Sequence, residues 1–193
     1  MNRRGISYED DPPWEMGRPH AEFVRLAEQG DICGSVLDVG CGTGENALYM
    51  ASLGHEVWGI DLAPHAVEKA QAKALSRGLS AKFFIANALE LSDLGRTFDS
   101  VIDCGLFHTF SDAERLMFAM GLSKVLRRGG TYFVLCMSEH ESTGWGRPRR
   151  VTQSEIRATF GKGWRVNYIR EARFGASLRG HGPSAWLSSI TRT

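Results

Sequence analysis

Three glycines follow a short apolar run that contains an acidic residue, and this spacing is the clearest chemical signal in the chain. Asp38 lies within the apolar residues 36–39, and Gly40, Gly42 and Gly44 come directly after them. Glycine permits a sharp turn and lets a ligand approach where a Cβ would collide. A helix predicted to begin after the turn would point its free amide N–H groups back at it. This strand, glycine turn and helix predict a site for a nucleotide-like ligand.

Charge indicates which nucleotide-like ligand the turn favours. Residues 42–47 also satisfy the relaxed dinucleotide fingerprint G-x-G-x-x-G/A. Asp38 and Glu45, however, lie on either side of the place where a pyrophosphate would bind, and two carboxylates repel a diphosphate. They suit a ligand that carries an ammonium and a sulfonium group. An NAD-dependent oxidoreductase is the alternative that the fingerprint allows.

The same stretch resembles a known family. Residues 37–44, Leu-Asp-Val-Gly-Cys-Gly-Thr-Gly, closely resemble motif I of the class I S-adenosylmethionine (SAM) dependent methyltransferases. In that family the glycine turn holds the methionine end of the cofactor. The resemblance therefore implies that SAM is the cofactor and that its contacts include Asp38, Gly40, Gly42 and Gly44.

Asp61 ends the next predicted strand, residues 55–61. It stands 21 positions after Gly40, close to the spacing of about 20 residues that places a carboxylate on a ribose diol. The resemblance makes Asp61 the ribose-binding acid and implies a further SAM contact at its neighbour Leu62. The alternative role for Asp61 is to cap the helix that begins at Pro64.

Two further loops complete the implied cofactor site. Asn87 and Ala88 follow the predicted strand 81–86 and match the family's adenine-contacting turn, although Asp is commoner than Asn there. The Asn87 carbonyl oxygen can still accept from the adenine amino group, and its alternative role is to hold a turn. Cys104 and Gly105 follow the predicted strand 98–103, where the family has motif IV, and the resemblance adds both to the cofactor contacts. The Asn/Asp-Pro-Pro-aromatic sequence that is common at this point in methyltransferases of nucleic-acid bases is absent.

His108 lies just past the same strand and is the candidate general base. Ligands of open parallel sheets bind at the carboxyl ends of the strands, so we expect this loop to face the methyl acceptor. An imidazole titrates near neutral pH and could take a proton from a hydroxyl, a thiol or a ring nitrogen. Alternatively, His108 hydrogen-bonds to the backbone and shapes the pocket. An acceptor that is already ionised needs no base.

The N-terminal segment is predicted to be a lid over the cofactor. Prolines and glycines make residues 1–18 irregular, yet the segment contains Trp14, a large aromatic residue that usually covers something. Residues 13–19 resemble the cofactor-covering segment of thiopurine-type small-molecule methyltransferases and of actinobacterial relatives that methylate heterocyclic toxins. The resemblance implies that Trp14 contacts SAM. A loose polar tail is the alternative.

The elements that must position these residues alternate between strands and helices. Pro19 can begin a first helix, and Ser111 and Thr152 each open a capping box. A short glycine-containing connection between the predicted strands 164–170 and 184–190 suggests an antiparallel hairpin. In the predicted helix 111–127, the residues expected largely inside are Leu116, Met117, Met120, Leu122, Val125 and Leu126.

These elements predict one α/β domain over residues 1–193, with residues 1–18 as the lid segment and 19–193 as the core. The resemblance implies a Rossmann-like class I methyltransferase fold. Its mostly parallel seven-stranded sheet should carry an antiparallel C-terminal edge hairpin, with helices on both faces.

Composition narrows the partners. The chain has 193 residues, 42% of them hydrophobic, and 23 basic residues against 22 acidic ones, so no general field favours nucleic acid or a membrane surface. No apolar run reaches the length of a membrane span or a signal core, which predicts a cytoplasmic protein. The four cysteines have no metal-ligand spacing, so we expect no metal. Nothing in the sequence gives the oligomeric state.

The sequence therefore predicts a SAM-dependent methyltransferase. The expected acceptor is a small aromatic or heterocyclic molecule that receives the methyl group on an oxygen, nitrogen or sulfur atom. A macromolecular acceptor is the alternative within the same enzyme class. Residues 147–150 could recognise an anion, although so short a basic run is more commonly a solvated turn.

Overall fold

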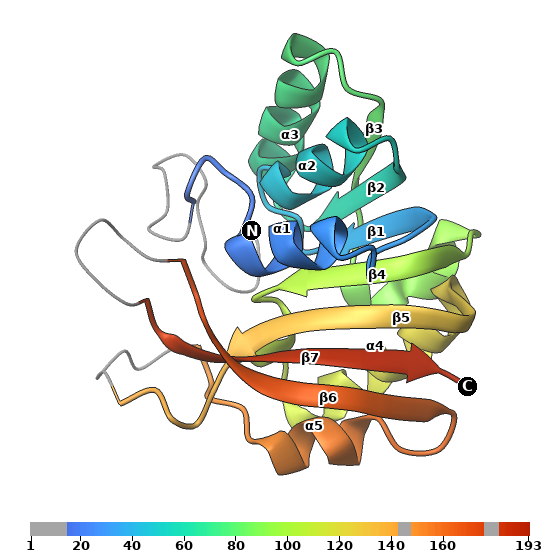
Figure 1. The fold of residues 1–193 in the computed structure, drawn as a ribbon. Helices are drawn as coiled ribbons and strands as arrows, with labels where there is room; N and C mark the ends of the chain where they lie inside the picture. Colours follow the sequence, from blue (N-terminus) through green and yellow to red (C-terminus); the bar gives the residue numbers. More distant parts are fainter. Residues whose placement is uncertain (1–14, 143–147, 176–181) are drawn as a thin grey trace.

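The computed structural model describes residues 15–142, 148–175 and 182–193. Its centre is a seven-stranded sheet in the order β3-β2-β1-β4-β5-β7-β6, with the first five strands parallel (Figure 1). β7 runs antiparallel to both β5 and β6. The predicted fold class is therefore confirmed. The strands are β1 Ser35–Val39, β2 Glu56–Asp61, β3 Ala81–Ile85, β4 Phe98–Cys104, β5 Leu126–Met137, β6 Trp164–Arg173 and β7 Ser184–Arg192.

Helices cover both faces of the sheet, and each face has its own core. Side chains alternate across each strand, so on β1 Val36 packs on one face while Leu37 and Val39 pack on the other. One core contains residues of α1, α2 and α3, and the other contains residues of α4, α5 and both 3-10 turns. The helices are α1 Ala21–Glu28, α2 Glu45–Ser52, α3 Pro64–Ser76, α4 Asp112–Val125 and α5 Gln153–Thr159, and the 3-10 turns are η1 Ala88–Leu94 and η2 Phe107–Thr109.

Helix ends follow the expected chemistry with one exception. Both predicted capping boxes are present, at Ser111 and at Thr152. The first helix begins at Ala21, however, so the prediction of Pro19 as its first residue was wrong. His20 caps this helix instead, because its Nδ1 accepts the N–H of Glu22 at 3.2 Å.

The inward face of α4 differs from the prediction. Leu116, Met117 and Met120 are 54%, 48% and 63% exposed, so their assignment to the core was wrong. Apolar residues surround most of this helix, so periodicity alone could not choose a face. Arg115 is the deciding residue, because it lies 1% exposed among apolar neighbours and pairs with Glu155 on α5 at 3.2 Å. The side chains that face inward are Arg115, Phe118, Ala119, Leu122 and Val125.

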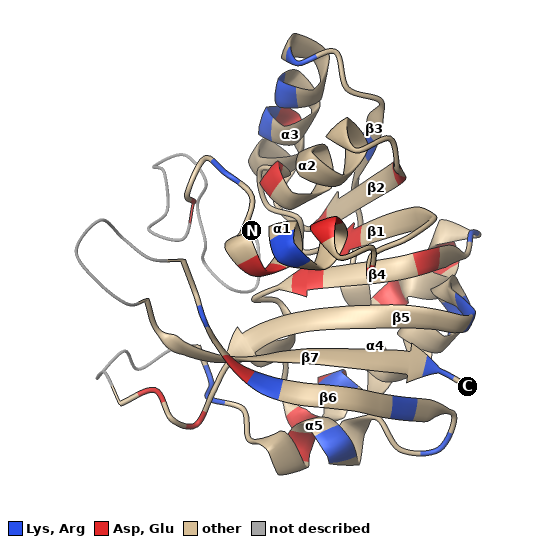
Figure 2. Cartoon of the chain, in the orientation of Figure 1, with Lys and Arg blue, Asp and Glu red and all other residues tan. Residues whose placement is uncertain are grey.

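The parallel topology brings the predicted site residues to one edge of the sheet. β1, β2, β3 and β4 all end at this edge, and β6 ends and β7 begins beside it (Figure 1). Figure 2 shows acidic residues on β4 and basic residues along α3. Within the described ranges, no helix combines the length and the apolar character that a membrane span requires.

Candidate cofactor and acceptor site

The glycine turn after β1 has the left-handed backbone that its sequence predicts. The φ angles of Gly40, Gly42 and Gly44 are +67°, +54° and +86°. A Cβ on Gly40 would lie 3.0 Å from the Cβ of Leu106, in the loop after β4. A Cβ on Gly44 would lie 2.9 Å from the Cβ of Ala70 on α3. The turn therefore needs glycine both for its conformation and for its close packing.

Asp61 ends β2 and holds the turn in place. Its Oδ2 accepts the N–H of Gly42 at 2.9 Å, and its Oδ1 accepts the N–H of Ala63 at 2.8 Å, just before α3. The bond to Ala63 gives Asp61 part of the capping role that was its alternative. Burial raises the pKa of the carboxyl, against the opposing effect of these backbone N–H groups. Each oxygen keeps a second lone pair for a ligand hydroxyl, so the ribose role stays a prediction.

Asp38 lies beneath the turn and fits a cationic ligand group. The side chain is 1% exposed, and its Oδ2 has no hydrogen-bond partner within the described ranges. Burial, followed by the neighbouring Asp103, raises the pKa of Asp38 to about 8. An unpartnered buried carboxylate oxygen is costly unless a donor or cation reaches it. The ammonium and sulfonium of SAM are groups that this oxygen suits.

Glu45 does not supply the second free negative charge that its sequence position suggested. Its two carboxylate oxygens accept from Arg77 at 2.9 Å each, and Lys73 approaches to 2.8 Å. Burial opposes ionisation, yet these partners hold the pKa of Glu45 below its usual value. The charge argument against a pyrophosphate therefore depends on Asp38 alone, in the ionised form that a cationic ligand would favour.

The loop after β3 shows the structural role of Asn87. Its Oδ1 accepts the N–H of Leu89 at 3.0 Å, so the side chain holds the start of η1. Ala88 is buried beside it, whereas Leu62, after β2, is 45% exposed. No contact in the described chain tests the predicted adenine and ribose roles of these residues.

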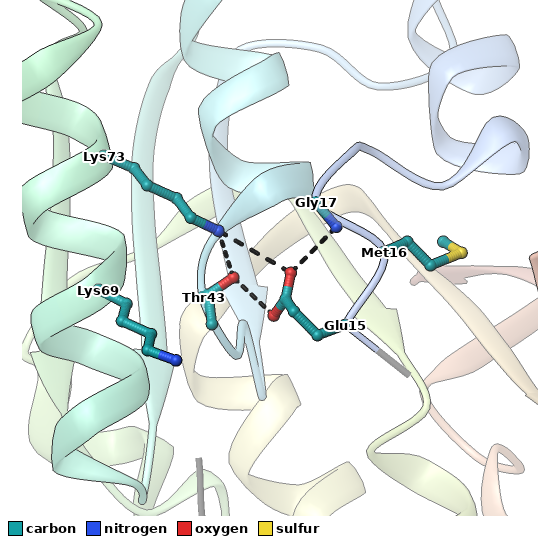
Figure 3. Close-up of a pocket in the computed structure, with 6 residues that line it drawn as sticks. All are labelled: Glu15, Met16, Gly17, Thr43, Lys69 and Lys73. Atoms are coloured by element: carbon teal, nitrogen blue, oxygen red, sulfur yellow. Dashed lines mark hydrogen bonds and ion pairs between the residues drawn. The ribbon is translucent and has the colours of Figure 1, made fainter. Parts of the chain in front are cut away.

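The described part of the N-terminal segment lies on the glycine turn. Glu15 accepts from the hydroxyl of Thr43 at 2.6 Å, and Lys73 on α3 donates to the same hydroxyl at 2.6 Å (Figure 3). Met16, Gly17 and Lys69 complete the lining of a cavity of about 440 Å³. Residues 15–17 therefore lie against the turn, and the lid stays a prediction. Trp14, the predicted SAM contact, lies outside the described residues.

A buried acid organises the loop after β4. Asp103 is fully buried and accepts the N–H of Leu106 at 2.7 Å, the N–H of Phe107 at 3.1 Å and the hydroxyl of Tyr132 at 2.8 Å. Burial is the main cause that raises its pKa to about 7. Sequence reasoning missed this role, although an acid at the end of an apolar strand before Cys104-Gly105 was a usable signal.

His108 is buried, and its backbone contact is the one expected as its alternative role. The imidazole is 7% exposed, and its Nδ1 accepts the N–H of Met137 at 3.0 Å. Burial, assisted by the positive charge of Arg115, lowers its pKa to about 3. A base must be able to hold a proton near neutral pH, so this environment gives no support to the base role.

A second cavity of about 570 Å³ lies between the start of α1, the residues after β5, the end of β6 and the start of β7. Phe174, just after β6, lines it and contacts the His108 ring edge-on, with the ring centroids 5.6 Å apart. Sequence reasoning gave no signal for Phe174. The polar and charged residues of the lining are His20, Glu22, Ser138, His140, Glu171, Arg173 and Ser184.

The short basic run takes part in ion pairs of the fold. Arg149, from the short basic run, pairs with Asp112 at 2.6 Å and also with Glu155, which favours the structural interpretation over anion recognition. The cysteines are free thiols, and the parts of the chain that the structure describes contain no cluster of His, Cys, Asp and Glu suited to a metal ion.

A family model and a similar protein sequence both identify this chain's relatives as methyltransferases. Residues 36–130 match a family model described as a methyltransferase domain. A 2-heptyl-1-hydroxyquinolin-4(1H)-one methyltransferase from Mycobacteroides abscessus is 34% identical over 168 residues, which cover 86% of this chain and 74% of that relative.

Solved structures agree with this sequence match. A structure from work on the conversion of a disulfide bond into a thioacetal group during echinomycin biosynthesis has a TM-score of 0.84 and 34% identity, covering 94% of this chain and 84% of that one. Magnesium protoporphyrin IX methyltransferase from Synechocystis PCC 6803, solved with bound SAM, shares the fold at 21% identity, with a TM-score of 0.68 and coverage of 89% and 76%.

Proposed function

This chain belongs to the class I SAM-dependent methyltransferases, and from that premise we propose that it methylates a small aromatic or heterocyclic molecule. The observation that carries the proposal is the pairing of two features at one sheet edge. The buried, unpartnered oxygen of Asp38 lies under the glycine turn, and a second cavity is lined by Phe174, whose ring contacts His108 in the loop after β4. The first feature fits a cationic cofactor, and the second has room for an acceptor.

The chain's own residues account for each part of SAM. Asp38 faces the methionine end, where the turn leaves room for a ligand close to the backbone. Asp61 and Leu62 lie on the ribose side, and Asn87 and Ala88 lie on the adenine side. Cys104 and Gly105 border the path from cofactor to acceptor. The residues that we propose as cofactor contacts are Trp14, Asp38, Gly40, Gly42, Gly44, Asp61, Leu62, Asn87, Ala88, Cys104 and Gly105.

The acceptor side suits a molecule of modest size. The cavity of about 570 Å³ falls within the range typical of small-ligand sites, about 300 to 1,000 Å³. Phe174 offers an aromatic edge, and the cavity also carries charges of both signs. The hydroxyquinolone relative acts on a bicyclic heteroaromatic compound, which supports a related acceptor here. Oxygen, nitrogen and sulfur remain the candidate atoms.

Positioning supplies most of the proposed rate acceleration. Bound SAM provides an activated methyl group with a good leaving group, so the protein must align the acceptor and exclude water. Gly105 and Phe174 border the acceptor, and we propose that residues 1–18 close over the cofactor as a lid. The bonds from Glu15 to Thr43 and from Lys73 to Thr43 hold the described end of this segment on the turn.

Ligand-dependent thermal unfolding and a methyl-transfer screen test the proposal. A ligand that binds only the folded state raises the melting temperature, so we expect SAM to raise it and NADH to leave it unchanged. We then expect transfer from SAM to at least one member of a panel of phenols, thiols and heteroaromatic amines. Stabilisation by NADH alone would favour the oxidoreductase alternative. Methylation of protein or nucleic acid but of no panel member would favour the macromolecular one.

A further inference from the structure

The His108 imidazole is fixed through one ring nitrogen, and its other nitrogen lies near Gly105. An amide N–H can only donate, so the bond from Met137 N–H to Nδ1 requires an unprotonated Nδ1. A neutral imidazole then carries its single proton on Nε2. Among the described residues, the hydrogen bond found for this ring is the one from Met137, and it uses Nδ1. His108 therefore presents an N–H donor, rather than a lone pair, to whatever lies beside Nε2.

The Nε2 edge of this ring points at the start of the loop after β4. A Cβ on Gly105 would lie 3.6 Å from Nε2 of His108 and 3.5 Å from the ring of Phe174. Gly105 has φ +92°, a conformation that excludes most side chains. The donor and the aromatic edge thus meet over a residue without a side chain. A single acceptor atom next to Gly105 would therefore contact both the imidazole and the Phe174 ring.

The charged groups around His108 favour its neutral form. Arg115 on α4 lies 4.9 Å over the ring of Phe107, next to His108, and its positive charge opposes protonation of the imidazole. Asp103 on β4 is the nearby acid, but its oxygens already accept from Leu106, Phe107 and Tyr132. The Cys136 thiol on β5 has its pKa raised, mainly by burial, so it adds no negative charge.

Other groups at this end of the sheet are also poor bases. Burial raises the pKa of the Cys104 and Cys41 thiols. Nδ1 of His20 is occupied by the N–H of Glu22, and burial lowers the pKa of this ring. His140 is a second histidine that lines the second cavity, and it is exposed and lies 3.7 Å from Glu171. It is therefore the natural control for any test of a histidine base.

We propose that His108 is a positioning hydrogen-bond donor to the nucleophilic atom of the acceptor, and that the preferred acceptors are acidic hydroxyl or thiol compounds that bind as anions. This inference rests on the proposed function and deepens it. The acceptor loses its proton to water before it binds. Its O⁻ or S⁻ electron pair then forms the bond to the methyl carbon while the methyl–sulfur bond of SAM breaks. The anionic and sulfonium charges cancel, and no proton is transferred to the protein.

Two substitutions distinguish the role of Nδ1 from the role of Nε2. His108→Asn keeps an acceptor near Nδ1 for Met137 N–H but removes the donor at the Nε2 position. His108→Gln reaches the Nε2 position with an amide N–H but loses the acceptor for Met137. We expect the Asn variant to lose about tenfold to hundredfold in kcat/KM, since hydrogen bonds to charged groups are worth about 1.5 to 3 kcal/mol, with little change in melting temperature. The Gln variant should lose only a few-fold in kcat/KM and melt at a lower temperature.

The pH profile identifies the group that ionises. With 4-nitrophenol, 4-cyanophenol and phenol as acceptors, the rising limb of kcat/KM should follow the pKa of each phenol, in wild type and in both variants. A limb that stays at one pH for all three phenols and disappears in His108→Asn would overturn the inference in favour of a His108 base. A limb that disappears only in His140→Asn would assign the base to His140 and also overturn it.

A spectroscopic readout tests the inference even if no panel compound is methylated. In ¹⁵N-labelled full-length protein, the His108 ring signals, assigned by comparison with His108→Asn, should show the Nε2–H form throughout pH 5.5 to 9. A proton on Nδ1, or a titration in that range, would overturn the donor role. Absence of turnover with these NMR signals as expected would count against the proposed function and not against the state of His108.

Discussion

The cofactor side and the proposed acceptor side of the site depend on different parts of the polypeptide, the first on its backbone and the second on its side chains. On the cofactor side, glycines and backbone N–H groups shape the turn, and Asp61 holds the N–H of Gly42. On the acceptor side, side chains shape the loop, because His108 and Asp103 each bond a residue of β5 that lies 29 positions away in sequence. Phe174 comes from a third segment, just after β6.

This difference separates what a sequence motif can specify from what it cannot. The cofactor side needs glycine wherever φ is positive, so its residues are constrained by local geometry. The acceptor side has no such backbone constraint, because side chains from distant strands form it and different side chains could fill the same positions. The cofactor side can therefore stay the same among enzymes that methylate different compounds, while the acceptor side varies.

Among the changes that test this difference, removal of residues 1–18 should have the largest effect on activity. We expect kcat/KM to fall at least a hundredfold, about 2.7 kcal/mol, because the proposed lid would no longer exclude water from the cofactor. The core should still unfold in one cooperative transition, measured by circular dichroism. A truncated protein that turns over at the normal rate would show that the segment is a loose tail.

Loss of Asp61 should break the cofactor side alone. Asp61→Ala removes the acceptor for Gly42 N–H and for the proposed ribose hydroxyls, with bonds to the charged carboxylate worth about 1.5 to 3 kcal/mol each. We expect SAM affinity, measured by calorimetry, to fall at least tenfold. Asp61→Asn is the matched control, since it keeps the shape without the charge and should lose less. An unchanged dissociation constant in the Ala variant would remove Asp61 from the site.

The raised pKa of Asp38 predicts a pH dependence of both stability and SAM binding. The folded carboxyl keeps its proton until about pH 8, whereas the unfolded one loses it near pH 4. Between these values the unfolded state binds fewer protons, so this group makes stability fall as pH rises. A cationic ligand favours the ionised form, so SAM binding should release protons and tighten by up to about tenfold per pH unit below pH 8.

Asp38→Asn checks this linkage. The variant should bind SAM more weakly, release fewer protons and lose part of the stability decline between pH 5 and 8. Calorimetry of SAM binding in buffers with different ionisation enthalpies measures the proton release. Equal proton release in wild type and variant would assign the linkage to another group, with Asp103 the next candidate because its pKa is raised to about 7.

The smallest expected effect concerns the contact that holds the N-terminal segment. Glu15→Gln weakens the hydrogen bond with Thr43 and the ion pair with Lys73. The two charged groups of this ion pair are 3.8 Å apart and partly exposed to solvent. Such pairs contribute about 0.2 to 1 kcal/mol, so SAM affinity should fall no more than about fivefold. Lys69→Met, which alters the same cavity, should change the affinity less. Equal losses in both variants would point to the cavity's general charge instead of the Glu15 contact.

The accuracy of the sequence predictions follows the same division. The parallel strands with their antiparallel C-terminal hairpin, both capping boxes and the glycine turn follow from local patterns, and the structure confirms them. The inward face of α4 was predicted wrongly because Arg115 is buried against Phe107 and Glu155, and these partners come from separate segments. The state of His108 depends on Met137 in the same way, so its position in a loop could not reveal which nitrogen is protonated.

The two outer strands of the sheet also affect how this chain behaves when many copies are present. A free strand edge offers unpaired N–H and C=O groups to another copy, which favours aggregation. β3 is only five residues long and carries Lys82 on its exposed surface. β6, at the other edge, alternates exposed and partly buried positions and carries Arg165, Glu171 and Arg173 on the exposed ones. Short length at one edge and charge at both discourage the sheet from growing by addition of a second molecule.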